Sequence, residues 1–256
     1  MTSDPADETM PIGDYLAQGG MLTSPENTPP RYRAELMRLM SSFVDSELAG
    51  SAGFADAVNL APGIKERIAA SRIVLEKADH AERVLDLMEG FGTDKALYNK
   101  AHNWSARGPR EAQVDARRQG GDMRLSVFHY PLAGWTDAVV MNVLMGQATL
   151  VHLDETARCS YQPLAEVIRD VLPRERRHME LGLEGLTRIA ATDEGKAEAQ
   201  TSVAYWMPRV AETFGAATSD RFDRLKGMGL RARDNATLKA EWESTANACL
   251  ADLGLQ

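Results

Sequence analysis

Apolar residues recur at three- and four-residue intervals along most of the chain from about residue 32 onward, which is the spacing of one helix face. The first such stretch carries a clear stripe of apolar side chains: Leu36, Leu39, Met40, Phe43, Val44 and Leu48. Similar stretches run from residue 64 to about 90, from 134 to about 159, and from Pro163 to about 190. The pattern therefore predicts four long helices.

The rest of the chain has a weaker pattern. Proline and glycine are frequent in the first thirty residues, and we expect an extended arm there that wraps the body or stays mobile. Residues 103–121 are rich in arginine and glycine and predict an irregular segment. Two or three more helices are expected between 194 and 253, broken near Gly215 and near Gly227–Gly229. Alternation with period two is nearly absent, so the predicted fold is all-α, with an arm over 1–30 and a single domain over 31–256.

The long helices form two similar pairs, roughly 35–90 and 134–190, each with a histidine near its end, His80 and His178. Duplicated helical hairpins build ferritin-like four-helix bundles, in which metal ligands face inward from each hairpin. We therefore predict a ferritin-like bundle with additional C-terminal helices.

Composition excludes several classes of protein. The net charge of −8 argues against a nucleic-acid partner, which requires a basic face. No run of 18 apolar residues predicts a membrane span. Two cysteines are too few for a disulfide framework, and the acidic N-terminus has no apolar run after it, so we expect a cytoplasmic protein.

The candidate functional residues are carboxylates and histidines, spaced along the predicted helices as metal ligands are. In two-metal bundles, two helices each supply one carboxylate and two others each supply a Glu-x-x-His pair. The chain has this pair once, as Glu175-Arg-Arg-His178, and Glu47 lies inside an apolar stripe, where an unpaired carboxylate is costly. Three residues before His80, where the second pair would need glutamate, stands Lys77.

Short motifs in a consistent order carry a family resemblance from about Tyr32 to the C-terminus. They are Ser46-Glu47-Leu-Ala-Gly50, Ala61-Pro62, Phe128-His-Tyr130-Pro131 with Trp135 and Asp137, Arg158-Cys-Ser160-Tyr161-Gln-Pro163, Glu175-Arg-Arg-His178-Met-Glu-Leu-Gly182, Trp206-Met-Pro208, Thr213-Phe214-Gly215, Asn235-Ala-Thr-Leu238 and Leu253-Gly254-Leu255. With these motifs the chain resembles the catalytic subunit of ring-1,2-phenylacetyl-CoA epoxidase.

The resemblance implies a ferritin-like bundle that uses two irons to activate O₂ and epoxidise an aryl-CoA thioester. It also implies a reductase that supplies electrons, a related metal-free partner subunit, and assembly into oligomers. The metal ligands that it implies are Glu47, His80, Glu175 and His178, together with two carboxylates that this chain lacks. Lys77 replaces the bridging carboxylate, and Gly146 replaces the acid of the third helix.

Two interpretations of these replacements stay open. In the first, the Lys77 ammonium pairs with Glu47 and Glu175 and takes the place of the metal. In the second, Glu76 rescues the metal site: it lies four residues before His80, an offset of about 40° around the helix, and a π-bulge would turn it inward.

Other polar residues are weaker candidates for the same site. Asp154 or Glu155 would replace the acid lost at Gly146, but Glu155 lies nine residues on, about 180° around the helix, and we expect it to be exposed. His102, His129 and His152 are expected to be structural or surface residues. In the resembled family this helix lines the substrate pocket, which implies a substrate-facing role for Leu144 and Leu150.

The sequence thus supports two functions. One is O₂-dependent oxygenation of an apolar or aryl-CoA-type substrate, with iron, two ions per chain if the site is functional. The other is a metal-free, non-catalytic subunit that binds a catalytic relative.

Overall fold

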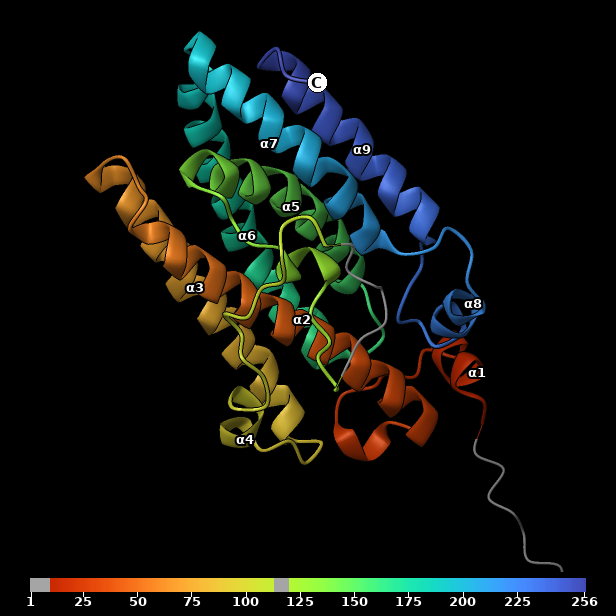
Figure 1. Ribbon diagram of the computed structural model, residues 1–256. Coiled ribbons are helices and arrows are strands. Elements are labelled where there is room, and N and C mark those ends of the chain that lie inside the picture. Colours follow the sequence, from red (N-terminus) through yellow and green to blue (C-terminus); the bar gives the residue numbers. More distant parts are fainter. Residues whose placement is uncertain (1–9, 113–119) are drawn as a thin grey trace, which may run out of the picture.

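The computed structural model describes residues 10–112 and 120–256, and within them the chain is helical, as predicted (Figure 1). The described part forms no β-strand, although an isolated bridge pairs Leu22 with Tyr161. The α-helices are α1 (Ile12–Ala17), α2 (Pro30–Val58), α3 (Ile64–Glu89), α4 (Lys95–Asn99), α5 (Trp135–Thr156), α6 (Gln162–Ile189), α7 (Asp193–Ala211), α8 (Asp220–Gly227) and α9 (Asn235–Asp252). Short 3-10 helices span Pro25–Asn27, Ser126–His129 and Glu212–Phe214.

Four helices form the bundle and two more cover one side of it. The hairpin α2–α3 packs beside the hairpin α5–α6, and the two meet mainly where α3 contacts α6. Helices α7 and α9 lie along α5, so that α5 has neighbours on several sides (Figure 1). Because α5 is apolar around most of its circumference, a central position is the one that buries its side chains. The ferritin-like bundle with extra C-terminal helices is confirmed.

The helix ends lie close to the predicted ones because glycine and proline mark them. Gly63 caps the start of α3, and Pro163 lies in the first turn of α6, where its missing N–H costs nothing. Gly134 precedes α5 with φ of 143°, a backbone conformation that L side chains rarely adopt. Helix α6 continues through Pro173, inside the stretch from Pro163 to about 190 that the sequence pattern predicted as one helix.

The described part of the N-terminal arm is bound to the body. Leu22 is fully buried, and its carbonyl accepts a hydrogen bond of 2.9 Å from the Gln162 N–H at the start of α6. Just after the arm, in the first turn of α2, the Tyr32 hydroxyl lies 2.8 Å from the Ser160 hydroxyl. The first nine residues of the predicted arm, and residues 113–119 of the predicted irregular segment, lie outside the described residues.

None of the helices in the described ranges combines the length and apolar character that a bilayer crossing requires.

Candidate metal centre and adjoining cavity

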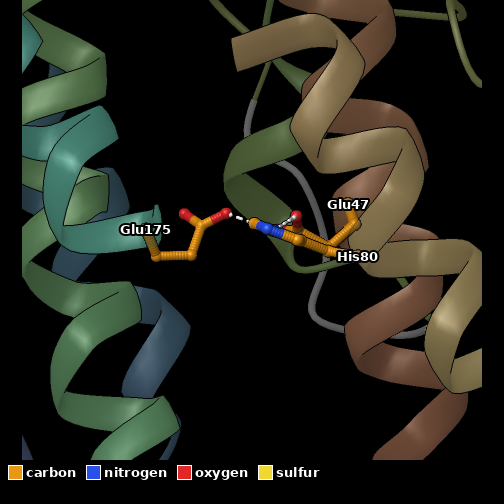
Figure 2. A group of neighbouring side chains, drawn as sticks. All are labelled: Glu47, His80 and Glu175. Carbon is orange, nitrogen blue, oxygen red and sulfur yellow. Dashed lines mark hydrogen bonds and ion pairs between the residues drawn. The ribbon is translucent and has the colours of Figure 1, made fainter. Parts of the chain in front are cut away.

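Five polar side chains meet inside the bundle, where α2, α3 and α6 face one another. Glu47 comes from α2, Lys77 and His80 from α3, and Glu175 and His178 from α6; each is at most 6% exposed. Residues three apart lie on one helix face, which brings both members of each α3 and α6 pair to the same place. Figure 2 shows Glu175 reaching from α6 toward His80 and Glu47 on the opposite hairpin.

The Lys77 ammonium group lies between the two carboxylates. Its Nζ donates to Glu47 Oε1 at 3.0 Å and to both oxygens of Glu175 at 3.1 Å. These ion pairs are the ones described in the first of the two interpretations that the sequence left open. Because charged groups so deeply buried are stable only when paired, one cation and two carboxylates here stabilise one another.

His80 completes the inner cluster. Its Nδ1 lies 2.9 Å from Glu175 Oε1 and 3.3 Å from Glu47 Oε2, while its Nε2 is buried without a hydrogen-bond partner among the described residues. One ligand atom from each of Glu47, His80 and Glu175 lies within 4.8 Å of the others, so this group could hold a metal ion.

Burial and the neighbouring charges shift the pKa values of these residues in opposite directions. Burial lowers the pKa of Lys77 and of His80, but the adjacent carboxylates outweigh burial and raise both. For Glu175, burial raises the pKa, and the charge of Lys77, together with the adjacent His80 and His178, holds it well below the usual range. The charges inside the cluster therefore favour the ionised forms of Lys77 and Glu175.

Glu76 joins the cluster from its edge. Its Oε2 lies 2.6 Å from His178 Nε2, and its side chain is 27% exposed. Helix α3 is regular here, so Glu76 reaches His178 without the π-bulge that the sequence-based hypothesis required. The other ring nitrogen of His178, Nδ1, is 3.3 Å from Glu175 Oε1 but outside hydrogen-bond geometry. Glu76 is thus bound to the histidine at the edge of the cluster, and its role as a replacement for the bridging carboxylate stays a prediction.

The residues present do not fit a two-iron centre. Lys77 puts a positive charge 3.0–3.1 Å from the carboxylates that would bind the metals, and a nearby cation repels a divalent ion strongly. Gly146 offers no carboxylate, and a Cβ added there would lie 2.9 Å from Met179 Cβ, because α5 and α6 are in close contact. The position that should carry the third-helix acid is therefore filled by the neighbouring helix.

A cavity of about 310 Å³ adjoins the cluster and is bordered by Glu47. On α5 its lining includes Met145, Thr149, His152 and Thr156, at positions i, i+4, i+7 and i+11, together with Leu153 and Glu155. The same spacing is present in the sequence and indicates the side of α5 that borders the cavity. Leu144 is instead fully buried in the core beside α7 and α9, and Leu150 is partly buried. A substrate-facing role for Leu144 and Leu150 remains a proposal.

The prediction that Glu155 is exposed is wrong, because only 3% of this residue is exposed. Its Oε1 accepts hydrogen bonds from the backbone N–H groups of Ala232 and, at 2.8 Å, Arg233, whose Nε donates to Oε2 at 2.8 Å. These partners are far away in sequence, so helix spacing could not indicate them. Glu155 attaches the C-terminal segment to α5 and does not join the metal centre.

His152 gives the fold a pH dependence. Burial, reinforced by the charge of Arg231, lowers the pKa of His152 to about 4 from an ordinary value of 6.5. Between these values the unfolded chain binds a proton that the folded chain does not, so stability falls as the pH drops. We expect a loss of up to about 3 kcal/mol from pH 7 to pH 4 through this residue.

Urea unfolding of the wild-type chain and His152→Leu at pH 7, 5.5 and 4.5 measures this contribution. The wild-type free energy of unfolding should fall more steeply with acidification than that of the variant. Parallel pH dependences would show that His152 does not titrate in this range.

Fold and site together define a class: a ferritin-like helical bundle with a degenerate carboxylate–histidine centre. Residues 16–256 match the family described as phenylacetic acid catabolic protein. The chain belongs to this family. Over 182 residues, 71% of this chain, it is 23% identical to one of the subunits of 1,2-phenylacetyl-CoA epoxidase from Escherichia coli (strain K12). The matched part spans about half of that relative, 54% of its length.

Proposed function

We propose that this chain is a metal-free, non-catalytic subunit that binds a catalytic relative in aromatic-compound metabolism. One observation carries the proposal: the Lys77 ammonium group bonds to both carboxylates that would otherwise hold metal. The ammonium satisfies Glu47 and Glu175 without an ion. Removing it from this position to admit a metal would leave Lys77 itself buried and unpaired, which is costly.

The kind of partner follows from what this chain lacks. A catalytic relative would carry a glutamate and a Glu-x-x-His pair on each hairpin, so that the complex contains one complete two-metal centre. A reductase would then deliver electrons to the relative. We propose that this chain contributes shape and stability to such a complex through its helical surface.

Elemental analysis of untagged protein from iron-supplemented, aerobic cells tests the proposal. We expect less than about one tenth of a metal ion per chain, because the ammonium already occupies the position between the two carboxylates. We also expect the chain to co-purify from its source cells with a relative that has the full ligand set, identified by mass spectrometry. About two irons per chain would contradict the proposal.

A second function is favoured by the cavity that reaches Glu47 and by the metal-binding geometry of Glu47, His80 and Glu175. Under this alternative the chain oxygenates an apolar or aryl-CoA-type substrate in an O₂-dependent reaction, with iron as cofactor. It requires Lys77 to leave the carboxylates. Substrate-dependent O₂ consumption by iron-loaded protein with a reductase would support this alternative, and its absence in a folded, iron-loaded protein would exclude it.

A further inference from the structure

Exposed apolar side chains gather on the outer face of α3. Ile64, Ile68 and Leu75 are 70%, 55% and 71% exposed. Positions i, i+4 and i+11 lie on one side of an α-helix, so these side chains form a single stripe about 16 Å long. Leu60, in the turn before the helix, is 52% exposed, and Figure 1 shows this α2–α3 turn at an outer edge of the molecule. We call the surface formed by these four residues the α3 stripe.

The same face of α3 becomes acidic beyond Leu75. Asp79, Glu82 and Asp86 continue the outer side of the helix, and each is exposed and ion-paired with a basic side chain. Charged residues of this kind are usual on the outer face of a helix. Apolar side chains that are exposed as a group, rather than singly, mark an interaction surface. The α3 stripe is therefore the half of this face that a partner is expected to cover.

Two basic side chains border the α3 stripe without carboxylate partners. Lys65 and Arg72 are exposed and lie seven residues apart, on the flank next to Ile68. Neither forms an ion pair within the described part of the chain. By contrast, Arg83, farther along the same flank, pairs with Asp79 at 3.2 Å. A partner with acidic side chains would therefore find two unneutralised cations beside the apolar stripe.

A second copy of this chain fits the α3 stripe poorly. In an antiparallel pair of α3 helices, the register that places Ile64 opposite the second copy's Leu75 also places Lys65 close to the second copy's Arg72. Like charges facing one another across an interface oppose binding. Sliding the helices until the basic residues meet the acidic half of α3 moves the apolar residues onto charged ones. The charge pattern therefore favours a different, acidic partner.

We propose that the α3 stripe binds a helix of the catalytic relative, with the partner's apolar side chains on Ile64, Ile68 and Leu75 and its acidic side chains on Lys65 and Arg72. This inference rests on the proposed function, because it identifies the surface that binding of a relative requires. A stripe of this length accommodates about three turns of a partner helix. Aspartate or glutamate at seven-residue spacing beside the partner's own apolar stripe would face the two cations.

Binding of the two purified proteins tests the surface. The relative with the full ligand set is identified by mass spectrometry in the complex isolated from the source cells and is then purified by itself. Biolayer interferometry measures its affinity for the wild-type chain and for the variants Ile68→Glu and Leu75→Glu. We expect each substitution to weaken binding by about tenfold or more, because central apolar contacts dominate the energy of an interface.

Leu97→Glu is the matched control for these variants. Leu97 is 69% exposed on α4, which lies beside the acidic half of α3 and not beside the α3 stripe. Its substitution should leave the affinity unchanged. All three side chains are exposed, so the variants should fold as the wild-type chain does. Unchanged affinity in both stripe variants, or an equal loss in the control, would overturn the assigned surface and leave the metal-free role standing.

The two cations provide an independent measurement. Binding of the wild-type chain should weaken as the NaCl concentration rises from about 0.05 M to about 0.3 M, because salt screens exposed charges. The double variant Lys65→Gln, Arg72→Gln should lose most of this dependence. Arg158→Gln is its control, because Arg158 is 64% exposed and already pairs with Asp154. An undiminished salt dependence in the double variant would show that the two cations do not face the partner.

Three further outcomes would contradict the proposal. A dimer of the wild-type chain in sedimentation velocity, converted to monomers by Leu75→Glu, would assign the α3 stripe to a second copy. Co-sedimentation with phosphatidylglycerol vesicles that Leu75→Glu abolishes would assign it to a lipid surface. A complex from the source cells that contains no relative with the full ligand set would contradict the proposed function, and with it the partner assigned to this surface.

Discussion

Replacing Lys77 by methionine should lower the free energy of unfolding by about 3–5 kcal/mol at pH 7, the range seen when one partner of a buried ion pair is removed. Lys77 is 6% exposed and bonds to Glu47 and Glu175. Without the ammonium group, two carboxylates would lie together in the protein interior, which does not stabilise their ionised forms. One of them must therefore take up a proton or leave the core. Urea unfolding of the two proteins measures the difference.

Lys95 provides the control for this experiment. It also contacts three carboxylates, those of Glu82, Asp86 and Glu89, but its own side chain is 26% exposed and theirs are about half exposed. Lys95→Met should therefore destabilise the fold far less than Lys77→Met does. Equal losses of unfolding free energy in the two variants would mean that burial does not increase the contribution of Lys77 to stability.

The deficit of Lys77→Met should shrink as the pH is lowered to 5. In the variant, burial and mutual repulsion raise the pKa of one carboxyl in the folded state, so the folded variant takes up a proton more readily than the unfolded chain. A deficit that is constant between pH 7 and pH 5 would contradict this explanation.

Most of the fold could be predicted because it depends on local information. The apolar spacing of α3 and the Gly63 and Pro62 that precede it indicated both the helix and its start, and the helix spans Ile64–Glu89 as expected. The central place of α5 follows likewise from its nearly uniform apolar composition.

The candidate site could be predicted only in part. A spacing of three residues reveals that Glu175 and His178 share a face, whatever lies opposite. Spacing along one helix cannot reveal which atoms approach from another. Glu155 was therefore expected at the surface, but in the structure the backbone near Arg233 covers it. Glu76 was expected to reach the site only from a distorted helix, but in the structure it bonds to His178 from a regular one.

The close contact at Gly146 is a second fact that only the three-dimensional structure supplies. By sequence alone, the double substitution Lys77→Glu with Gly146→Asp would complete the set of metal ligands. A Cβ there lies 2.9 Å from Cβ and 3.1 Å from Cγ of Met179, so Gly146→Asp by itself should destabilise the fold by about 1–3 kcal/mol through overpacking. Met179→Ala removes the Cγ contact and part of this cost.

The triple variant Lys77→Glu, Gly146→Asp, Met179→Ala should therefore gain a metal centre. It restores the Glu-x-x-His pair 77–80 beside the existing pair 175–178 and adds the carboxylate of the third helix, while Glu47 already faces the site. We expect about two divalent ions per chain after reconstitution with iron or cobalt under anaerobic conditions, against less than about one tenth in the wild-type chain.

The added carboxylates make the same variant unstable without metal, because they lie together in the core with no cation among them. Metal that binds the folded state alone raises the free energy of unfolding by about 4 kcal/mol when its concentration is a thousandfold above Kd. The thermal midpoint of the variant should thus rise steeply with added metal, whereas that of Lys77→Met should not. A folded triple variant that binds no more metal than the wild-type chain would mean that Lys77 is not what keeps metal out. The loss of the site would then have to lie in the packing of α5 against α6, the contact that Gly146 makes with Met179.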